Sequence, residues 1–169
     1  MADRSSIESI LASLESSPWR GRAFRVMLYD YPPDRENTVG ARWNPPETAA
    51  IYMCLEPEVC IAEVEYGLRR QPRPVKTGIP RTLYEIDVEL SSVVNLESAL
   101  DDLKEIGIGR PQLFADDMKV SREIGRVVTW LGCDGLLVPS ARKTGTNLVI
   151  YPARATESYK YEVIGGKPL

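Results

Sequence analysis

Three side chains that could carry chemistry lie within one short stretch, GARWNPPETAAIYMCLEPEVCIAEVEYGLR, which runs from residue 40 to residue 69. Arg42, Tyr52 and Glu63 follow one another in it at spacings of 10 and 11 residues. An arginine binds anions, a tyrosine ring stacks on flat ligands, and a carboxylate stabilises developing positive charge or accepts hydrogen bonds. The question is whether the surrounding elements bring the three together.

Glu63 occupies an unusual position on its predicted helix. At about 100° per residue, it falls at the shoulder of an apolar arc, between Val59 and Cys60. A partly buried carboxylate needs a cation or several hydrogen-bond donors, because an unpaired one is strongly destabilising. Two interpretations stay open here. Glu63 forms a structural ion pair with Arg42 or Arg25, or it is held in a cleft for catalysis.

The other residues of this stretch also allow two interpretations. Arg42 presents a planar guanidinium that matches phosphate or carboxylate groups. Trp43 beside it is expected to anchor the loop in the core. Tyr52 lies in the middle of a predicted strand, where it is either a core aromatic or a flat wall for a nucleobase or a nicotinamide. Gly67 leaves open space one turn below Glu63, which a ligand could occupy.

Composition limits the classes of function. The chain has 169 residues, of which 43% are hydrophobic and 27% charged, and its formal net charge is −3. This length predicts one domain, 1–169, with a core of its own. No long basic run occurs, which argues against direct contact with nucleic acid. The N-terminus does not resemble a secretory signal, and no run of about 18 apolar residues occurs. We therefore expect a soluble, cytoplasmic protein that does not enter a membrane.

The sequence contains no histidine and three cysteines. The missing histidine excludes a Ser-His-Asp triad and an HExxH zinc site, so we expect no metal. Any chemistry must then use Arg, Glu, Asp, Ser, Thr, Tyr or Lys, or a group of the substrate. Cys54, Cys60 and Cys133 form no CxxC pair. Cys54 and Cys60 are close enough in sequence to meet, but buried free thiols are the favoured interpretation.

Hydrophobic periodicity predicts an α+β fold rather than a doubly wound one, because strands and helices alternate without a regular rhythm. Predicted helices cover about 5–16, 57–70, 98–107 and 118–131. Predicted strands cover 23–29, 48–55, 82–90 with a continuation over 93–96, a short run within 133–141, 146–152 and 160–164. Residues 71–81 are predicted to form a loop.

The order of these motifs resembles the RES domain family. The resemblance rests on FRV at 24–26, on the stretch that begins with GARWNPP, and on DGLLVPSARKTGTNLVIYP at 134–152, so that it covers about residues 22–152. Members of this family are bacterial toxins, usually encoded beside an Xre-type antitoxin. The resemblance implies a single-domain fold like the core of ADP-ribosyltransferases, with a split mixed or antiparallel sheet flanked by helices.

The resemblance also implies roles for individual residues. It assigns the catalytic roles to Glu63, Arg42, Tyr52 and Ser140. The residues predicted to bind substrate are Arg25, Trp43, Asn44, Lys119 and Asn147. The serine has an alternative, because some relatives use a serine at the start of the preceding helix. This chain has DDMKVSRE there, with Lys119 at the aligned position and Ser121 nearby.

The activity implied by the resemblance is cleavage of the nicotinamide–ribose bond of NAD, by phosphorolysis or hydrolysis. Such a reaction passes through an oxocarbenium-like transition state and releases a neutral pyridine. It needs a carboxylate near the developing charge and arginines for the phosphates, but no acid and no metal. NAD is then the substrate, inorganic phosphate a possible co-substrate, and no cofactor is expected.

Two other functions are open for this pocket, and the resemblance implies a protein partner. The same pocket could transfer ADP-ribose to a protein, or it could be an inactive module that binds a nucleotide or a partner. The resemblance implies a cognate Xre-type antitoxin that covers the active site. It is also compatible with a homodimer or a toxin–antitoxin hetero-oligomer, in which any contact with DNA belongs to the antitoxin.

Overall fold

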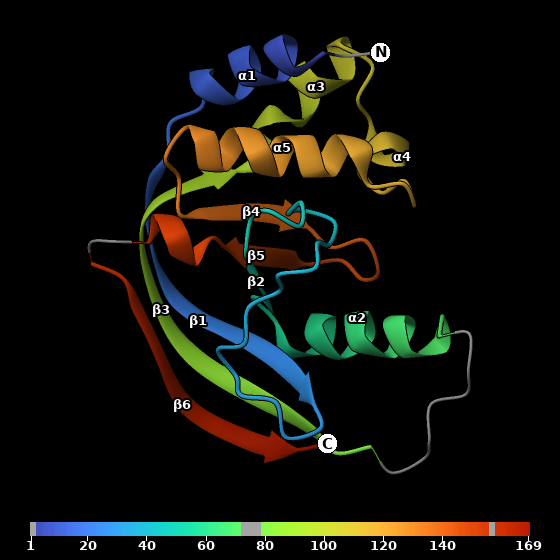
Figure 1. Cartoon of the computed structure of the whole chain (residues 1–169), viewed down its shortest axis with the longest axis vertical. Helices are drawn as coiled ribbons and strands as arrows, with labels where there is room; N and C mark the ends of the chain where they lie inside the picture. The colour runs from blue at the N-terminus through green and yellow to red at the C-terminus, as the bar shows by residue number, and fades with distance from the viewer. Residues whose placement is uncertain (1–2, 72–78, 156–157) are drawn as a thin grey trace.

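The computed structural model describes residues 3–71, 79–155 and 158–169, which form a sheet with helices packed around it (Figure 1). In chain order the elements are α1 (Arg4–Ser13), β1 (Ser17–Leu28), β2 (Ile51–Cys54), α2 (Pro57–Arg69), β3 (Arg81–Asn95), η1 (Leu96–Ala99), α3 (Leu100–Glu105), α4 (Arg110–Leu113), α5 (Lys119–Trp130), β4 (Gly135–Pro139), β5 (Thr146–Ile150), η2 (Pro152–Arg154) and β6 (Lys160–Pro168). The mixed order of strands and helices confirms the α+β prediction.

The sheet is organised around the long strand β3. The strand order is β1-β2-β5-β4-β3-β6, and β3 also pairs with β1. Most of β3 lies between β1 and β6 in antiparallel pairing, whereas its end, from Val93 to Asn95, pairs with β4 in parallel. β6 and β4 therefore occupy the same side of β3 at different heights. This arrangement splits the sheet and makes it mixed, because all the other pairings are antiparallel.

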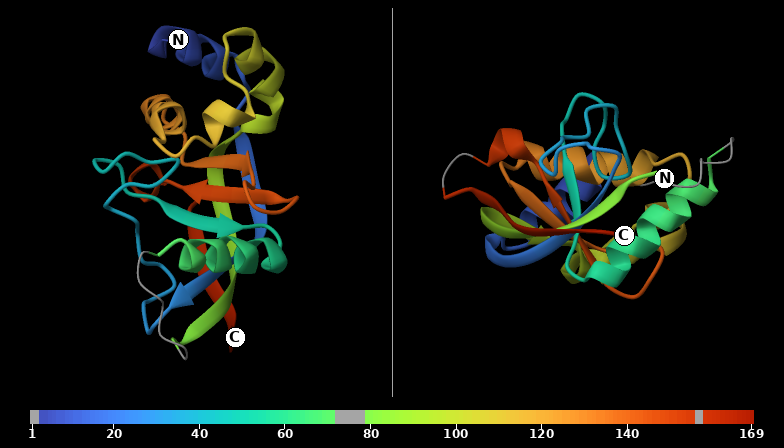
Figure 2. Two further views of the ribbon diagram at one scale, coloured as in Figure 1. Left: turned by 90° about the vertical axis from the view of Figure 1, so that its right-hand side faces the viewer. Right: turned by 90° about the horizontal axis from the view of Figure 1, so that it is seen from below.

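Helices cover the sheet in two places. In Figures 1 and 2, α5 lies along β4, and α1 and α3 lie beyond α5. Their apolar faces form one core with the inner side of β4 and β5, in which Ile7, Leu11, Ile124, Val127 and Leu136 are buried. The second place is α2, which packs on β1 and β2 around a smaller cluster that contains Val26, Cys54, Val59, Cys60 and Leu83. The candidate site lies between these two regions.

Several predicted boundaries differ from those observed. Helix α1 ends at Ser13 rather than near residue 16, and it is capped by Asp3, whose Oδ1 accepts from the Ser6 backbone at 2.9 Å. Strand β1 begins at Ser17 rather than at residue 23, because it follows β3 over nearly its whole length. Strand β2 begins only at Ile51, since Thr48 closes a turn onto Pro45. Helix α4 was not predicted. The predicted loop over 71–81 falls mostly on 72–78, outside the described residues.

Two local predictions are confirmed, namely the continuation of β3 after residue 90 and the buried free thiols. The run after residue 90 continues β3, and Gly107 follows the end of α3 with a φ of 86°. Cys54, Cys60 and Cys133 are free and buried. In the described part of the chain, no helix is long and apolar enough to cross a membrane. Within the same residues, no group of three or more His, Cys, Asp or Glu side chains is placed to hold a metal ion.

Candidate active site

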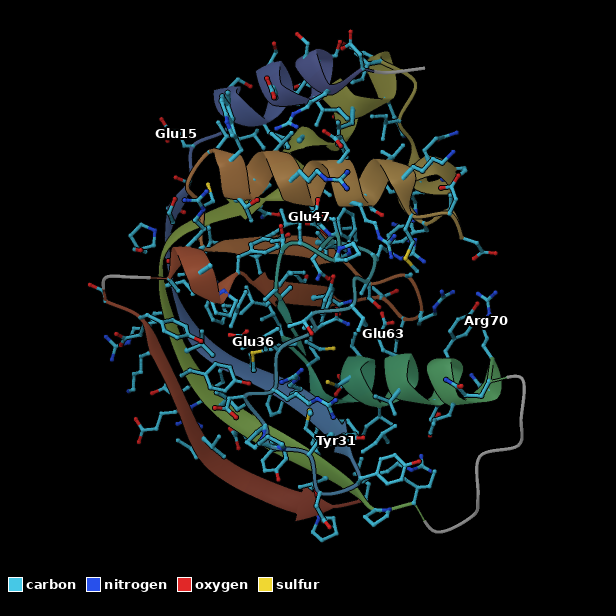
Figure 3. The ribbon with its side chains drawn as sticks, viewed as in Figure 1. Glu15, Tyr31, Glu36, Glu47, Glu63 and Arg70 are labelled. Atoms are coloured by element: carbon cyan, nitrogen blue, oxygen red, sulfur yellow. The ribbon has the colours of Figure 1, made fainter. Side chains whose placement is uncertain are left out.

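Glu63 projects from α2 toward the strands and is held by two side chains from elsewhere in the sequence (Figure 3). Its Oε1 accepts from Ser140 Oγ at 2.6 Å and from Asn147 Nδ2 at 3.2 Å. Among the described residues, no lysine or arginine nitrogen lies within 4.0 Å of this carboxylate. The interpretation of Glu63 as one half of an ion pair with Arg42 or Arg25 is therefore wrong. Hydroxyl and amide donors hold the charge instead.

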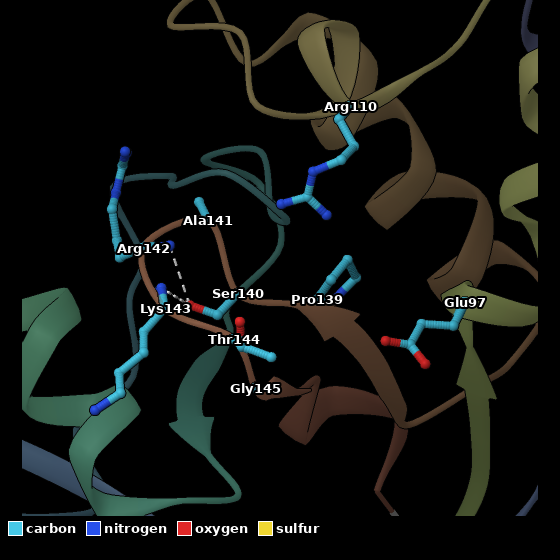
Figure 4. A pocket seen from close by; sticks show the side chains of 9 residues that line it. All are labelled: Glu97, Arg110, Pro139, Ser140, Ala141, Arg142, Lys143, Thr144 and Gly145. Carbon is cyan, nitrogen blue, oxygen red and sulfur yellow. Dashed lines mark hydrogen bonds between the residues drawn. The ribbon is translucent and has the colours of Figure 1, made fainter.

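The loop between β4 and β5 brings Ser140 to Glu63. The Ser140 backbone donates to the Gly145 carbonyl at 2.9 Å, and its Oγ accepts from the backbone N–H of Arg142 at 3.2 Å (Figure 4). Gly145 lies directly against the first turn of α2, where a Cβ atom would overlap the Val59 side chain. A larger residue at 145 would force the loop away from the helix. This close approach places the Ser140 hydroxyl beside Glu63.

Tyr52 and Asn44 form a buried hydrogen-bond network. The Tyr52 hydroxyl donates to Asn44 Oδ1 at 2.6 Å and accepts from the Trp43 backbone at 2.9 Å, and burial raises the pKa of Tyr52 well above its usual value. Asn44 is fully buried, and its Nδ2 donates to the Thr48 carbonyl at 2.6 Å. Its amide fixes the loop, and Asn44 lines none of the three cavities described below, so contact between Asn44 and substrate stays a prediction. Trp43 is buried in the core, as expected for an anchor.

The two predicted arginines lie on different sides of the site. Arg42 Nη1 donates to the Ala115 carbonyl at 3.0 Å, and its guanidinium lies 5.7 Å from the centre of the Phe114 ring. Burial and, next to it, the charge of Arg142 lower the pKa of Arg42. Arg25 donates to the Pro33 carbonyl at 2.6 Å. Both guanidinium groups are therefore braced by backbone carbonyls and have no carboxylate partner within 4.0 Å in the described residues.

Two adjoining cavities meet at Glu63. The first, which we call the apolar cavity, has a volume of about 420 Å³ and is lined by Arg25, Met27, Cys54, Cys60 and Val64 among others. The second, which we call the arginine cavity, has a volume of about 100 Å³ and is lined by Arg42, Phe114, Pro139, Ala141 and Arg142 among others. Tyr52, Glu63 and Asn147 line both cavities. A ligand that spans the two would pass the Glu63 carboxylate.

A third cavity lies along the loop that carries Ser140 (Figure 4). This loop pocket has a volume of about 450 Å³, and its polar lining includes Arg110, Ser140, Arg142, Lys143 and Thr144. It shares Pro139, Ala141 and Arg142 with the arginine cavity. The basic side chains therefore extend from one cavity into the next, on the side of the site away from the apolar cavity.

The structure brings together most of the predicted site residues. Tyr52, Glu63 and Asn147 line both adjoining cavities, Arg42 lines the arginine cavity, and Arg25 lines the apolar one. Ser140 reaches the same place through its hydrogen bond to Glu63. Lys119 is an exception, because its side chain is exposed at the start of α5 and lines none of the three cavities. Ser121, the alternative serine, is buried, and its Oγ donates to the Met118 carbonyl at 3.3 Å.

Sequence reasoning missed three residues that line the cavities, namely Arg110, Phe114 and Arg142. Arg142 lies in the VPSAR motif, and its guanidinium sits 3.4 Å from the centre of the Tyr66 ring. A basic residue two positions after a candidate serine was the available signal. No comparable signal exists for Arg110 and Phe114, since they belong to the unpredicted helix α4 and its C-terminal end.

Comparisons with known proteins find related sequences and a related structure. NAD(+) phosphorylase MbcT of Mycobacterium tuberculosis (strain ATCC 25618 / H37Rv) and that of Mycobacterium bovis (strain ATCC BAA-935 / AF2122/97) are each 27% identical to the chain over 118 residues. This match covers 68% of the chain and only 63% of either relative. The crystal structure of the M. tuberculosis MbcT–MbcA toxin–antitoxin complex has the same fold, with a TM-score of 0.82, 21% identity, and coverage of 97% of this chain and 92% of that one. The RES domain model matches residues 16–167, and the chain therefore belongs to the RES domain family.

Proposed function

We propose that this protein cleaves the nicotinamide–ribose bond of NAD by phosphorolysis, and that it acts as a toxin. The observation that carries the proposal is the Glu63 carboxylate, held by Ser140 and Asn147 where the apolar and arginine cavities meet. The similarity to proteins named NAD(+) phosphorylase supports the choice of substrate and of phosphate as acceptor.

Glu63 would act on the developing positive charge. As the C–N bond to nicotinamide breaks, the ribose acquires oxocarbenium character, and a nearby carboxylate stabilises it. Both hydrogen bonds of Glu63 go to Oε1, and the described residues offer no hydrogen bond to Oε2. Oε2 is therefore available to the ribose. The bond electrons leave with nicotinamide, which departs as a neutral ring, and a phosphate oxygen forms the new bond to the ribose carbon.

The remaining residues would bind and orient the substrate. Tyr52 presents its ring to both cavities while its hydroxyl is occupied, so it would act as a wall for the nicotinamide ring rather than as an acid. Asn147 Oδ1 is buried without a hydrogen-bond partner in the described residues, and a ribose hydroxyl would satisfy it. Arg42 and Arg142 line the arginine cavity, where they would bind the pyrophosphate or the attacking phosphate.

The wider assignments belong to the same proposal. We infer that a cognate antitoxin restrains the enzyme, with the MbcT–MbcA complex as the precedent for such a pair. The split sheet would be a variant of the ADP-ribosyltransferase core, and the enzyme would act on the cytoplasmic pool of NAD. No metal or cofactor enters the proposed reaction. A homodimer or a hetero-oligomer with the antitoxin is compatible with it.

Glu63→Gln tests the proposal most directly. Glutamine retains the oxygen that accepts from Ser140 and Asn147 but removes the negative charge. Purified wild type and variant would be incubated with NAD, with and without inorganic phosphate, while nicotinamide and the ADP-ribosyl product are measured. Glu65→Gln is the matched control, because Glu65 lies on the same helix and is exposed. We expect both the wild type and Glu65→Gln to form a phosphorylated ADP-ribose, and Glu63→Gln to form almost none.

Each other outcome has a definite meaning. Release of nicotinamide at the same rate without phosphate, with free ADP-ribose as product, would replace phosphorolysis by hydrolysis. A folded wild type that releases no nicotinamide would refute the proposal, and a labelled protein in cell extract would then indicate ADP-ribosyl transfer. Equal activity of Glu63→Gln and wild type would remove Glu63 from the mechanism.

A further inference from the structure

Two cysteines meet beneath the apolar cavity, although neither has a part in the proposed reaction. Cys54 is the last residue of β2 and lies opposite Phe24 of β1 in the antiparallel register. Cys60 lies in the first turns of α2, and its Sγ is 3.2 Å from the carbonyl oxygen of that same Phe24. Because Cys60 reaches the backbone of the residue paired with Cys54, the two side chains are neighbours.

Both thiols are protected from bulk solvent and yet reach the cavity. Each residue is 5% exposed, and both belong to the cluster under α2 that also contains Val26 and Val59. Both line the apolar cavity together with Glu63. A small oxidant that enters this cavity therefore meets both sulfur atoms. Cys133 is buried in the separate core under α5 and lines none of the three cavities.

The surroundings make the two thiols unequal. The neighbouring Cys54 thiol lowers the pKa of Cys60, burial opposes this, and the backbone at Val26 and Cys54 acts in the lowering direction. The position of Cys60 near the N-terminus of α2 favours its thiolate as well. The neighbouring Cys60 sulfur and burial raise the pKa of Cys54. Cys60 is thus the more nucleophilic member of the pair.

We propose that Cys54 and Cys60 are a redox modification site that a peroxide closes to an intramolecular disulfide, and that this closure lowers the activity of the adjoining site. The assignment stands on the position of both sulfur atoms in one cavity, next to the same β1 residue. The effect on activity rests on the proposed function, whereas formation of the disulfide does not.

Hydrogen peroxide would close the pair in two steps. The Cys60 thiolate attacks one peroxide oxygen, the O–O bond breaks, and the other oxygen leaves as hydroxide. Cys60 is then a sulfenic acid. The Cys54 sulfur attacks the Cys60 sulfur, the S–O bond breaks, and water leaves with the proton of the Cys54 thiol. In sum, two thiols and one peroxide give one disulfide and two waters, and the thiols supply the two electrons.

Closure would act on Glu63 through α2. Cys60 and Glu63 are three residues apart and therefore lie on the same face of the helix. The two free sulfur atoms must approach to about 2.05 Å to form a disulfide, so the first turns of α2 must move toward β2. Glu63 would move with them relative to Ser140 and Asn147, which belong to the other side of the site. We expect nicotinamide release to fall at least fivefold and to recover on reduction.

The sequence allows a direct test, because trypsin releases one peptide, residues 43–69, that carries both cysteines and no internal Lys or Arg. Reduced full-length protein would be treated with hydrogen peroxide, alkylated and digested. The disulfide is expected as a peptide lighter by two hydrogen atoms that resists alkylation until dithiothreitol is added. Cys133, on a different tryptic peptide, is the internal control and should be alkylated throughout. Cys54→Ser and Cys60→Ser should each form no such peptide and keep their activity after peroxide.

The outcomes separate the two proposals. Complete alkylation of the 43–69 peptide after peroxide, or oxidation of Cys133 at the same rate, would overturn the modification site. A disulfide that forms without a fall in nicotinamide release would overturn the effect on activity. If the reduced protein releases no nicotinamide at all, the proposed function fails, while the mass measurement still decides whether the disulfide forms. If one cysteine variant does not fold, the other one serves.

Discussion

Two helical glycines offer a sharp test of how the site is held, because the same substitution should have opposite effects at them. Gly125 in α5 lies against the loop that carries Arg42. A Cβ atom there would overlap the Trp43 carbonyl oxygen, and it would lie 2.9 Å from the carbonyl carbon and 3.3 Å from the Tyr151 hydroxyl. Gly67 in α2 has no atom within 4 Å of the same position. Gly125→Ala and Gly67→Ala are therefore a matched pair.

The expected magnitudes follow from these surroundings. In a helix, alanine is favoured over glycine by about 0.5–1 kcal/mol. The Gly67→Ala protein should therefore be more stable than the wild type by roughly this amount. At Gly125 the overlap costs about 1–3 kcal/mol. The displaced carbonyl also loses the 2.8 Å hydrogen bond from Tyr151, which costs about 1–3 kcal/mol more. After the helical gain is subtracted, the free energy of unfolding of Gly125→Ala should be about 3 kcal/mol lower than that of the wild type. This lowers Tm by roughly 6–12 °C in a chain of this size.

Thermal unfolding of the two variants and the wild type, at one pH and one salt concentration, measures both effects. Gly67→Ala should raise Tm slightly and leave nicotinamide release unchanged. Gly125→Ala should lower Tm and, at a temperature where it is still folded, also lower nicotinamide release, because the loop that holds Arg42 has moved. A Gly125→Ala protein as stable as Gly67→Ala would refute the close packing of α5 on this loop.

Three further predictions concern single side chains. Ser140→Ala removes a donor to the Glu63 carboxylate, worth about 1.5–3 kcal/mol, and should lower kcat/KM for NAD by roughly 10–100-fold while the protein stays folded. Asn44→Ala leaves buried polar groups unpaired and should reduce the free energy of unfolding in urea by about 2–4 kcal/mol, whereas Lys119→Ala, at an exposed position, should leave it unchanged. Burial raises the pKa of Tyr161 to about 12, above the value of about 10 in an unfolded chain, so its contribution to stability is complete below pH 10 and lost between pH 10 and about 12. Tyr161→Phe should flatten the fall in Tm over that range.

The sequence was most informative where one pattern decided the local structure. The helix from Pro57 to Arg69 was predicted nearly to the residue, because Pro57 favours the first turn and the apolar arc is continuous. The start of β1 was not predicted, since Ser17 and Pro18 look like a break. They join the strand only because β3 extends beside them. Because β1 and β3 are far apart in the sequence, their pairing cannot be predicted from the residues around Ser17 alone.

The same distinction applies to the candidate site. Motif order identified the residue types around Glu63, but it could not separate Asn44 from Asn147. Both are asparagines in quoted motifs, and both were expected to bind substrate. In the structure Asn44 is fully buried and satisfied by its own loop, while Asn147 lines both cavities and has a buried oxygen without a partner in the described residues. Only burial and hydrogen bonding distinguish the two.

The choice between two serines depended on a glycine. Ser121 and Ser140 were both candidates, and each precedes an arginine or lies near one in the sequence. Ser140 reaches Glu63 because Gly145, at the end of its loop, permits contact with Val59 in the first turns of α2. A side chain at Gly145 would hold the loop away from the helix that carries Glu63. The catalytic geometry that we propose is therefore set as much by a residue without a side chain as by the carboxylate and hydroxyl that it brings together.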